Sequence, residues 1–303
     1  MRNPGKLFLV GIGMGAAAVA FQSNVHSQDN DAIRRGEYLV RAAGGCSCHA
    51  DPDSRVFSLA GGRAIETPFG TIYGTNLTPD PETGIGGWSD EDFAAAMREG
   101  IGPDGTVYYP VFPYPSFTKM TDEDVRDMKS YLDSLPPVNK ANRSPELRFP
   151  YSSRSSVSVW RGLHFEVGRY QPDEGRSDQW NRGAYLSEAL AHCGECHTPR
   201  TFMGASDQDR FYAGSVDGPE GELAPNITPH EATGIGAWSG PDMVWFLQTG
   251  FAPDGENSKG LMGEVIERGY QYLTPEDLEA VAEYLGSLPP IDNEIEAPLS
   301  TPK

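Results

Sequence analysis

The sequence predicts an all-α protein built from two copies of one helical domain, with an ordered strap between them. A tandem repeat is the first observation: residues 76–89 recur at 226–239, and residues 103–105 recur at 253–255, both at a spacing of 150. The second is the helical spacing of apolar residues behind N-cap residues. The third is that the Gly/Pro-rich loops between these helices show no strand-like alternation.

The repeat also sets the expected division of the chain. Each copy closes on a Leu-Pro-Pro sequence, because proline cannot continue a helix. Trp160, Leu163 and Phe165 make the strap more apolar than a free linker, so we expect it to pack on the domains. The predicted segments are a signal peptide at 1–27, a first domain at 32–138, the strap at 139–177, a second domain at 178–290 and a C-terminal tail at 291–303.

Helices are expected at equivalent places in the two copies. The first covers residues 32–44. Ser89 and Thr121 are predicted to cap later helices, and Thr274 followed by Pro275 repeats the pattern in the second copy. The loops between helices are long, and a domain with so little regular structure needs a large group at its centre, which fits a bound cofactor.

The N-terminal residues are typical of an export signal. Arg2 and Lys6 precede an apolar run at 7–20, and small residues follow at 25–27. This run is shorter than the roughly 20 residues of a membrane span, and an uncleaved N-terminal anchor is the alternative. No later stretch is apolar for long enough, so we expect no membrane span after signal cleavage. If the protein is exported, it works in an oxidising compartment.

The net charge limits the classes of macromolecule that the protein is expected to bind. The chain has 24 Lys+Arg and 43 Asp+Glu, which gives a net charge of −19. An acidic surface repels phosphate backbones, so a nucleic-acid partner is excluded. The same surface favours basic protein partners and salt-sensitive association. The alternative is that the acidity serves only solubility.

The four cysteines point to the chemistry, because each lies close to a histidine. Cys193, Cys196 and His197 form the C-x-x-C-H motif of c-type haem attachment. Two thiols at this spacing reach the two vinyl groups of one porphyrin, and the adjacent histidine supplies the proximal nitrogen. Three other interpretations stay open: a zinc site, a redox C-x-x-C pair and disulfides between the copies.

The first copy departs from this motif. Cys46, Cys48 and His49 form a C-x-C-H sequence, in which Cys48 is placed for one vinyl group. Cys46 is one residue too close and reaches the other vinyl group only with a distorted backbone, for which Gly44 and Gly45 supply freedom. We therefore predict a haem held by Cys48, and held by Cys46 as well if the backbone distorts enough for the second bond. Loss of this haem is the alternative.

Five segments carry a resemblance to a known family, and they are residues 61–70, 76–89, 109–114, 180–186 and 193–200. Over about 32–290 the chain resembles the tandem di-haem cytochromes c that serve as electron-acceptor subunits of bacterial periplasmic dehydrogenases. The resemblance implies two class I cytochrome c-like domains, two haem c groups with iron ligated by His49 and His197, and a periplasmic location. Membrane association through a partner or an uncleaved signal is the alternative location.

The same resemblance implies an electron-transfer protein and not an enzyme. The implied donor is a periplasmic dehydrogenase, of the alcohol, aldehyde, sugar-acid or molybdenum hydroxylase type. The implied acceptor is another cytochrome, a copper protein or a terminal oxidase. The alternative function is a di-haem enzyme, such as a peroxidase or a sulfur-compound oxidase, with an open or unusually ligated first haem. Some relatives have a third haem domain and a membrane-binding tail, and neither is expected here.

The sixth iron ligands are predicted from methionines. Met262, in a Gly-rich segment expected to be a loop, is the candidate for the second haem, and a His/Met pair raises the haem potential. Many relatives have methionine where this chain has Phe112, so Met120 is the remaining candidate for the first haem. Another ligand, or none, is the alternative there.

Supporting residues are assigned by role. The Pro199 carbonyl is expected to accept a hydrogen bond from the second ring nitrogen of His197. Asn76 and Asn226 are expected to brace loops through local hydrogen bonds. Four residues are candidate partners of the haem propionates: Trp88, Trp238, Arg63 and Arg200. The alternative is core packing for the two tryptophans and an ordinary surface position for the two arginines.

Overall fold

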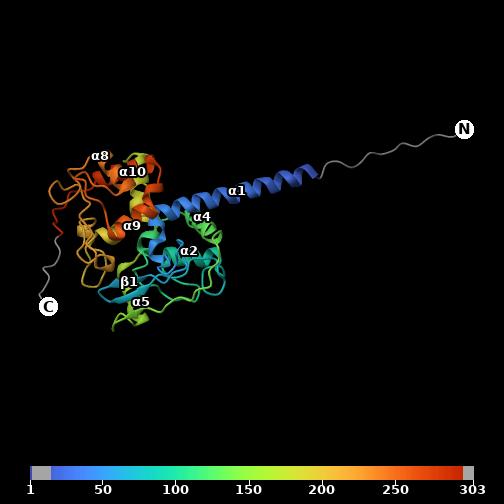
Figure 1. Ribbon diagram of the computed structural model, residues 1–303, viewed down its shortest axis with the longest axis horizontal. Helices are drawn as coiled ribbons and strands as arrows, with labels where there is room; N and C mark the ends of the chain where they lie inside the picture. Colours follow the sequence, from blue (N-terminus) through green and yellow to red (C-terminus); the bar gives the residue numbers. More distant parts are fainter. Residues whose placement is uncertain (2–14, 296–303) are drawn as a thin grey trace.

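The fold is mostly helical, as predicted, and its two halves follow the sequence repeat (Figure 1). The structure is a computed structural model that describes residue 1 and residues 15–295. Helix α1 (Gly15–Ala42) projects from the body and ends inside it. The predicted signal peptide lies largely outside the described residues, since residues 2–14 are not described. No helix in the described part of the chain has the length and apolar character to cross a membrane.

The helices of the two copies correspond in order. Those of the first copy are α1, α2 (Asp90–Glu99), α3 (Tyr114–Phe117) and α4 (Asp122–Asp133). Those of the second copy are α6 (Asp178–Tyr185), α7 (Cys193–His197), α8 (Gly240–Thr249), α9 (Gly260–Arg268) and α10 (Pro275–Gly286). In each copy the first helix packs on the last, α1 on α4 and α6 on α10.

The predicted N-caps are confirmed. The Ser89 hydroxyl accepts a hydrogen bond from the backbone N–H of Asp92 at 3.1 Å, and the Asp92 carboxylate accepts the backbone N–H of Ser89 at 3.0 Å. Thr121 and Thr274 cap α4 and α10 in the same way, each through the N–H of an aspartate three residues on. Local sequence therefore fixes where these helices begin.

Each first helix crosses the last helix of its copy at a glycine. A Cβ atom on Gly36 would lie 1.9 Å from the carbonyl oxygen of Asp127 in α4. A Cβ atom on Gly183 would lie 1.9 Å from the carbonyl oxygen of Ala280 in α10. Because no side chain fits in either place, the repeated Arg-Gly-x-Tyr-Leu sequence marks the same close helix crossing in both copies.

The tyrosine of this repeated sequence reaches across to the other copy. The Tyr38 hydroxyl donates a hydrogen bond to Asp277 at 2.5 Å, near the start of α10. The Tyr185 hydroxyl donates to Asp124, near the start of α4. Each hydroxyl also accepts the N–H of the N-cap threonine of the same helix. The two copies thus dock through one pair of contacts made twice, as an approximate two-fold arrangement.

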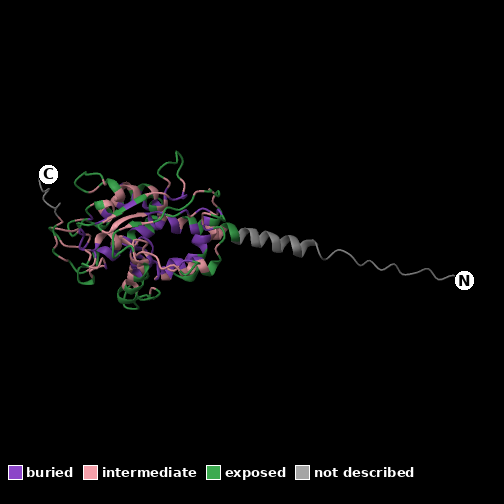
Figure 2. Ribbon diagram, turned by 90° about the horizontal axis from the view of Figure 1, so that it is seen from below, coloured by how far each residue is buried: buried purple, intermediate pink, exposed green. Residues whose placement is uncertain are grey.

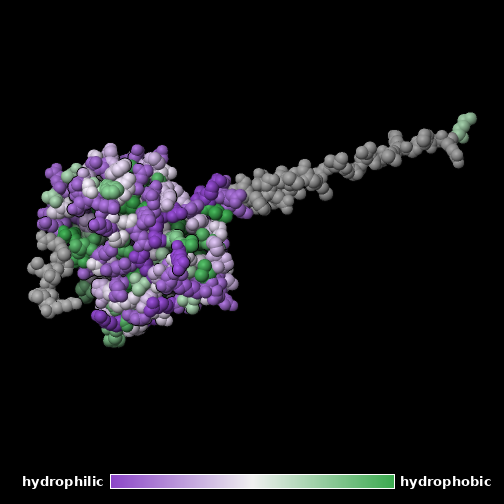
Figure 3. All heavy atoms as spheres, in the orientation of Figure 1, coloured by the Kyte–Doolittle hydropathy of each residue, from purple (hydrophilic) through white to green (hydrophobic). Residues whose placement is uncertain are grey.

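One apolar core runs through both copies. Leu39 and Leu132 of the first copy belong to the same buried cluster as Leu186 and Leu278 of the second. Figure 2 shows buried residues concentrated inside the body and exposed residues mostly at its periphery. The face shown in Figure 3 is mostly hydrophilic, in keeping with the net charge of −19. The two copies therefore stabilise each other through shared apolar burial.

A small sheet corrects the all-α prediction. Strands β1 (Ala64–Thr67), β2 (Gly70–Tyr73) and β3 (Glu146–Leu147) form an antiparallel sheet in the order β1-β2-β3. Gly70 has a φ of 129°, which favours glycine at the turn between the first two strands. Strands of four and two residues are too short to show a recognisable alternation, which is why the sequence pattern did not reveal them.

The segment between the copies contains β3 and helix α5 (Arg154–His164). Trp160 donates its ring N–H to the carbonyl of Met203 in the second copy at 2.9 Å. Phe165 packs edge-on against Tyr114 of the first copy, with the ring centroids 4.8 Å apart. Leu163, in contrast, is exposed. The strap thus contacts both copies through two of its three large apolar residues.

The glycine crossing can be tested with two alanine variants of the mature holoprotein. Gly183→Ala is expected to lower the free energy of unfolding by at least about 2 kcal/mol, because its methyl group meets a backbone carbonyl that is part of a helix. Gly286→Ala, in the partner helix α10, has open space around its Cβ and is expected to be neutral or to stabilise by up to about 1 kcal/mol. Urea unfolding measures both, and equal stabilities would contradict the crossing.

Candidate functional site

The two motif histidines are held in the same way. His197 ends α7, and its Nδ1–H donates to the carbonyl of Pro225 at 2.7 Å. His49 ends the short 3₁₀ segment Gly44–His49, and its Nδ1–H donates to the carbonyl of Thr75 at 2.8 Å. Thr75 and Pro225 are 150 residues apart, so the repeat places the two acceptors too. In both rings Nε2 keeps a free lone pair.

The predicted acceptor for His197 was wrong. The Pro199 carbonyl accepts the backbone N–H of Asp207 at 2.9 Å and does not contact the ring. Pro199 lies two residues after His197 and leads into a turn closed by the bridge between Arg200 and Ser206. The acceptor instead comes from a loop 28 residues on, which is brought to the histidine by the tertiary fold.

The two asparagines brace the loops that carry these carbonyls, as predicted. Asn76 directly follows Thr75; its side-chain amide donates to the hydroxyl of Thr83 at 3.2 Å and to the carbonyl of Val138 at 2.8 Å. Its carbonyl oxygen accepts both the N–H and the hydroxyl of Thr78. Asn226 makes the equivalent hydrogen bonds in the second copy, to partners at 228, 233 and 291. These buried bonds fix each carbonyl, and hence each histidine ring.

The backbone of the first motif is distorted, as the short spacing of its cysteines requires. Gly44, Gly45 and Cys46 have φ values of 73°, 68° and 53°, three successive left-handed residues. For Cys46, which is not a glycine, this costs about 1–3 kcal/mol. A Cβ on Gly45 would also meet the carbonyl oxygen of Arg268 at 2.8 Å, so this turn lies against α9 of the second copy.

The thiols and imidazoles of the two motifs are flanked by protein but keep some contact with solvent. All four cysteines are free; Cys48 is exposed and the other three are partly exposed. Burial raises the pKa of the Cys46, Cys193 and Cys196 thiols to about 12. Burial also lowers the pKa of both motif histidines, although their hydrogen bonds to backbone carbonyls oppose the shift.

This donor set fits haem c. Each site offers a neutral imidazole with a free Nε2, a fixed ring orientation and solvent-accessible thiols beside it. The zinc alternative finds no support, because no group of three or more His, Cys, Asp or Glu side chains is placed to hold a metal ion within the described residues. The disulfide alternative finds none either, since the four thiols are free.

The two predicted methionine ligands lie in different settings. Met262 is in the first turn of α9, which corrects the expectation of a loop; the carboxylate of Glu222 holds this turn by accepting the N–H of Leu261 at 2.8 Å. Met120 is fully buried, directly before the Thr121 cap. Phe112 faces His49, with ring centroids 6.5 Å apart and ring planes at 87°.

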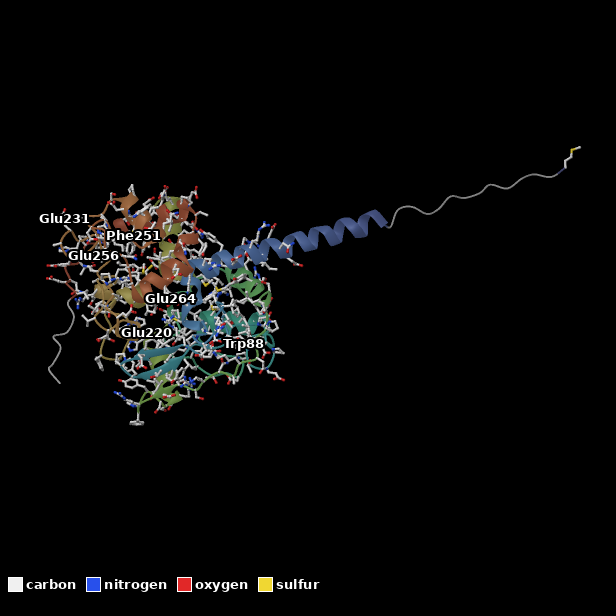
Figure 4. All side chains as sticks on the ribbon, viewed as in Figure 1. Trp88, Glu220, Glu231, Phe251, Glu256 and Glu264 are labelled. Atoms are coloured by element: carbon white, nitrogen blue, oxygen red, sulfur yellow. The ribbon has the colours of Figure 1, made fainter. Side chains whose placement is uncertain are left out.

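Arg63 takes part in an ion-pair cluster that joins the copies. Its guanidinium donates to Glu220 at 2.9 Å and to Glu264 at 2.6 Å, both in the second copy. Arg268 also pairs with Glu264, at 2.9 Å. Figure 4 labels the two glutamates near the middle of the molecule. Sequence reasoning missed this cluster, because no spacing in the chain indicates which loops of the two copies meet.

The cluster lies beside the first attachment site. Burial raises the pKa of the Cys48 thiol; Arg63 opposes this shift, and Glu220 and Glu264 add to it. Arg200 is likewise engaged, with the carboxylate of Glu195 at 2.9 Å. Both predicted propionate partners therefore have carboxylate partners in this structure, and propionate binding by either stays a prediction.

The two tryptophans occupy equivalent, half-buried positions. Trp88, labelled in Figure 4, and Trp238 both pack against the apolar core. Trp238 also lies edge-on to Phe246, with the ring centroids 5.2 Å apart. Neither ring N–H donates to another protein group among the described residues. Their predicted role as propionate donors is thus compatible with the free ring N–H groups and remains a prediction.

Comparison with known proteins identifies the family. The chain is 40% identical over 267 residues to a diheme cytochrome c-type protein of Cereibacter sphaeroides, which covers 85% of this chain and 86% of that protein. It is 42% identical over 265 residues to the fructose dehydrogenase cytochrome subunit of Gluconobacter japonicus, and 43% identical over 263 residues to a nicotinate dehydrogenase subunit of Pseudomonas putida. No protein-family model matches the chain.

The chain belongs to the di-haem c-type cytochromes. Its relatives include cytochrome subunits of fructose, alcohol and gluconate dehydrogenases. The matches cover 87% of this chain and 54% of the fructose dehydrogenase protein, and 84% of this chain and 21% of the nicotinate dehydrogenase protein. The chain thus spans about half and about a fifth of the length of these two relatives.

The ion-pair cluster can be tested by charge removal. Arg63→Gln is expected to lower the free energy of unfolding by about 1–3 kcal/mol, because it leaves Glu220 partly buried without its guanidinium partner. Arg34→Gln is the control, since its pair with Asp31 is exposed, and it is expected to change stability by less than about 0.5 kcal/mol. Urea unfolding distinguishes the two, and equal small effects would mean that the cluster does not join the copies.

Proposed function

We propose that the chain carries one haem c in each copy and passes electrons from a periplasmic dehydrogenase to a downstream cytochrome, copper protein or terminal oxidase. The two copies would be cytochrome c domains at 32–138 and 178–290. Haem supplies reversible one-electron chemistry when it is bound. The residues of the chain hold it, orient it and set its surroundings.

The observation that carries this proposal is the repeated imidazole hydrogen bond. His49 and His197 each donate Nδ1–H to a backbone carbonyl that precedes a bracing asparagine. This fixes the tautomer and leaves Nε2 for iron, as in metal sites where an outer partner orients the ligating ring. Finding it twice, at the spacing of the repeat, supports two iron sites.

The attachment residues are assigned from their distance along the chain to each histidine. Cys193 and Cys196 would form two thioether bonds in the second copy, and Cys48 one in the first. Cys46 has the left-handed backbone that a second bond would require, and its free thiol is partly exposed. Met262 is the proposed sixth ligand of the second iron, in a helical turn held by Glu222.

A chain of aromatic contacts links the two sites. Phe112 faces His49 at 6.5 Å and packs on Phe117 at 5.6 Å. Phe117 in turn packs on His192 at 5.5 Å, and His192 directly precedes Cys193. The attachment segments of the two copies are therefore joined by a series of neighbouring aromatic side chains. This supports electron transfer from one haem to the other within one chain.

The proposed partners follow from the relatives and the charge. The names of two relatives connect them to fructose and nicotinate dehydrogenases, which supports a dehydrogenase as donor for this chain. With a net charge of −19, docking should favour a basic partner surface and weaken with added salt. The predicted signal peptide supports the periplasm as the location.

Haem content tests the proposal. The mature protein is expected to give two haems per chain in a pyridine-haemochrome assay, and His197→Ala should remove the low-spin spectrum of one haem only. In the second copy a Cys193→Ala, Cys196→Ala double variant should leave one covalent haem. One haem per chain in the unaltered protein would contradict the proposal for the first copy.

Attachment in the first copy is expected to be asymmetric. Cys48→Ala should reduce the covalent haem from two to one per chain, whereas Cys46→Ala should leave two. A single thioether leaves one vinyl group conjugated with the ring, so the reduced α-band should be split or broadened. Mass spectrometry of the haem peptide reads out the number of bonds, and two thioethers at Cys46 and Cys48 would show the prediction to be wrong.

A further inference from the structure

The two copies differ in the side chain that the repeat places opposite the iron-binding histidine. Phe112 and Met262 are 150 residues apart, which is the spacing of the repeat up to residues 105 and 255; from the caps Thr121 and Thr274 onward the spacing is 153. A thioether sulfur has a lone pair to donate to iron, whereas a phenyl ring has none. The duplication therefore pairs a ligand in the second copy with a side chain in the first that cannot bind iron.

Phe112 is an aromatic neighbour of His49. Its ring is 6.5 Å from the His49 ring, centroid to centroid, and the planes stand at 87°. A porphyrin on Nε2 also stands perpendicular to the imidazole, so the phenyl ring is able to lie flat on the opposite porphyrin face. A metal–nitrogen bond of about 2 Å and a carbon contact of about 3.5 Å would take up this separation, so a diatomic ligand would bind the iron only when the Phe112 ring turns aside. No other protein ligand fits between the iron and this ring.

Neighbouring aromatic rings hold Phe112 in place. Tyr108 lies edge-on at 5.9 Å and Phe117 is tilted against it at 5.6 Å. Burial raises the pKa of the Tyr108 phenol to about 12, so this hydroxyl stays protonated and is a poor iron ligand. Two aromatic rings thus border Phe112.

The methionines of the first copy correspond to apolar core residues of the second copy. Each is buried, and the residue at the equivalent place in the second copy has no lone pair to donate. The pairs are Met97 with Leu247, which are 150 residues apart, and Met120 with Leu273 and Met128 with Val281, which are 153 residues apart like the caps Thr121 and Thr274. The fold therefore uses these three positions for packing.

Met120 has a structural task that accounts for its burial. It directly precedes the Thr121 cap, and Val125 is the N4 residue of the same helix; both are almost completely buried. Leu273 and Leu278 occupy the equivalent positions around the cap of α10. An apolar residue before the cap that packs on the fourth helical residue is a hydrophobic staple, which sets the direction of the incoming chain. A leucine serves this purpose equally well.

We propose that the first haem iron has an open sixth coordination position beneath Phe112, where small uncharged diatomic ligands bind. This inference rests on the proposed di-haem function. The aromatic rings around Phe112 favour an uncharged ligand over an anion, because an anion would lose hydration on entering these surroundings. The second iron, with Met262, is closed to such ligands.

Carbon monoxide is the probe. Haem content is measured first, and the fully reduced mature protein is then titrated with carbon monoxide by optical spectroscopy. We expect one carbon monoxide per two haems. Met262→Ala should raise this to two, because it opens the second iron. Phe112→Met should lower it to none and convert a high-spin haem to a low-spin one.

Two variants serve as controls. Phe117→Met makes the same substitution five residues away, at a ring that does not face His49, and should leave one carbon monoxide per two haems. Met120→Leu keeps the apolar packing and should change neither the spin state nor the stoichiometry. A low-spin wild type that becomes half high-spin with Met120→Leu would overturn the proposal and make Met120 the ligand.

Failure of this inference is separable from failure of the proposed function. Two haems with no bound carbon monoxide would overturn the open position and leave the di-haem function intact. Binding of one carbon monoxide that Phe112→Met does not abolish would place the open iron elsewhere and also overturn it. One haem per chain would contradict both.

Discussion

The close crossing of the first and last helices in each copy determines where the rest of the structure lies. At Gly36 and Gly183 the two helices approach until a Cβ would touch a backbone carbonyl oxygen. Each attachment motif follows directly from the first helix, so the crossing fixes the start of the loop that carries the cysteines and the histidine. The loops around it lack regular structure and depend on other restraints. Asn76 and Asn226 supply these by tying several loop segments together inside each copy.

The copies are coupled as well as repeated. Tyr38 of the first copy bonds to the start of α10 in the second, and Tyr185 of the second copy bonds to the start of α4 in the first. One apolar core runs through both copies. This docking brings the first attachment turn against α9 and joins the copies through the ion pairs of Arg63. It also completes the aromatic contacts from His49 to the second attachment motif. Since electron transfer needs two centres held at a constant separation, a rigid shared core suits this function better than two linked but independent domains.

Features with local causes were predictable from the sequence, and those that depend on docking were not. The caps at Ser89 and Thr121 follow from the adjacent residues, and the left-handed backbone at Cys46 follows from its short motif. The acceptor for His197 was wrongly assigned to Pro199, because a neighbour in sequence was preferred to a loop 28 residues on. The repeat itself held the missing signal, since it pairs Thr75 with Pro225. The partners of Arg63 had no such signal.

The central claim is that one chain holds two iron centres, each on a histidine oriented by a backbone carbonyl. Crystals of the mature protein, measured at the iron absorption edge, test it most directly, because anomalous scattering locates iron without assuming the fold. The account predicts two peaks per chain, one at Nε2 of His49 and one at Nε2 of His197, with Nδ1 of each ring still bonded to the carbonyls of Thr75 and Pro225. A single peak, or iron bound through Nδ1, would contradict it.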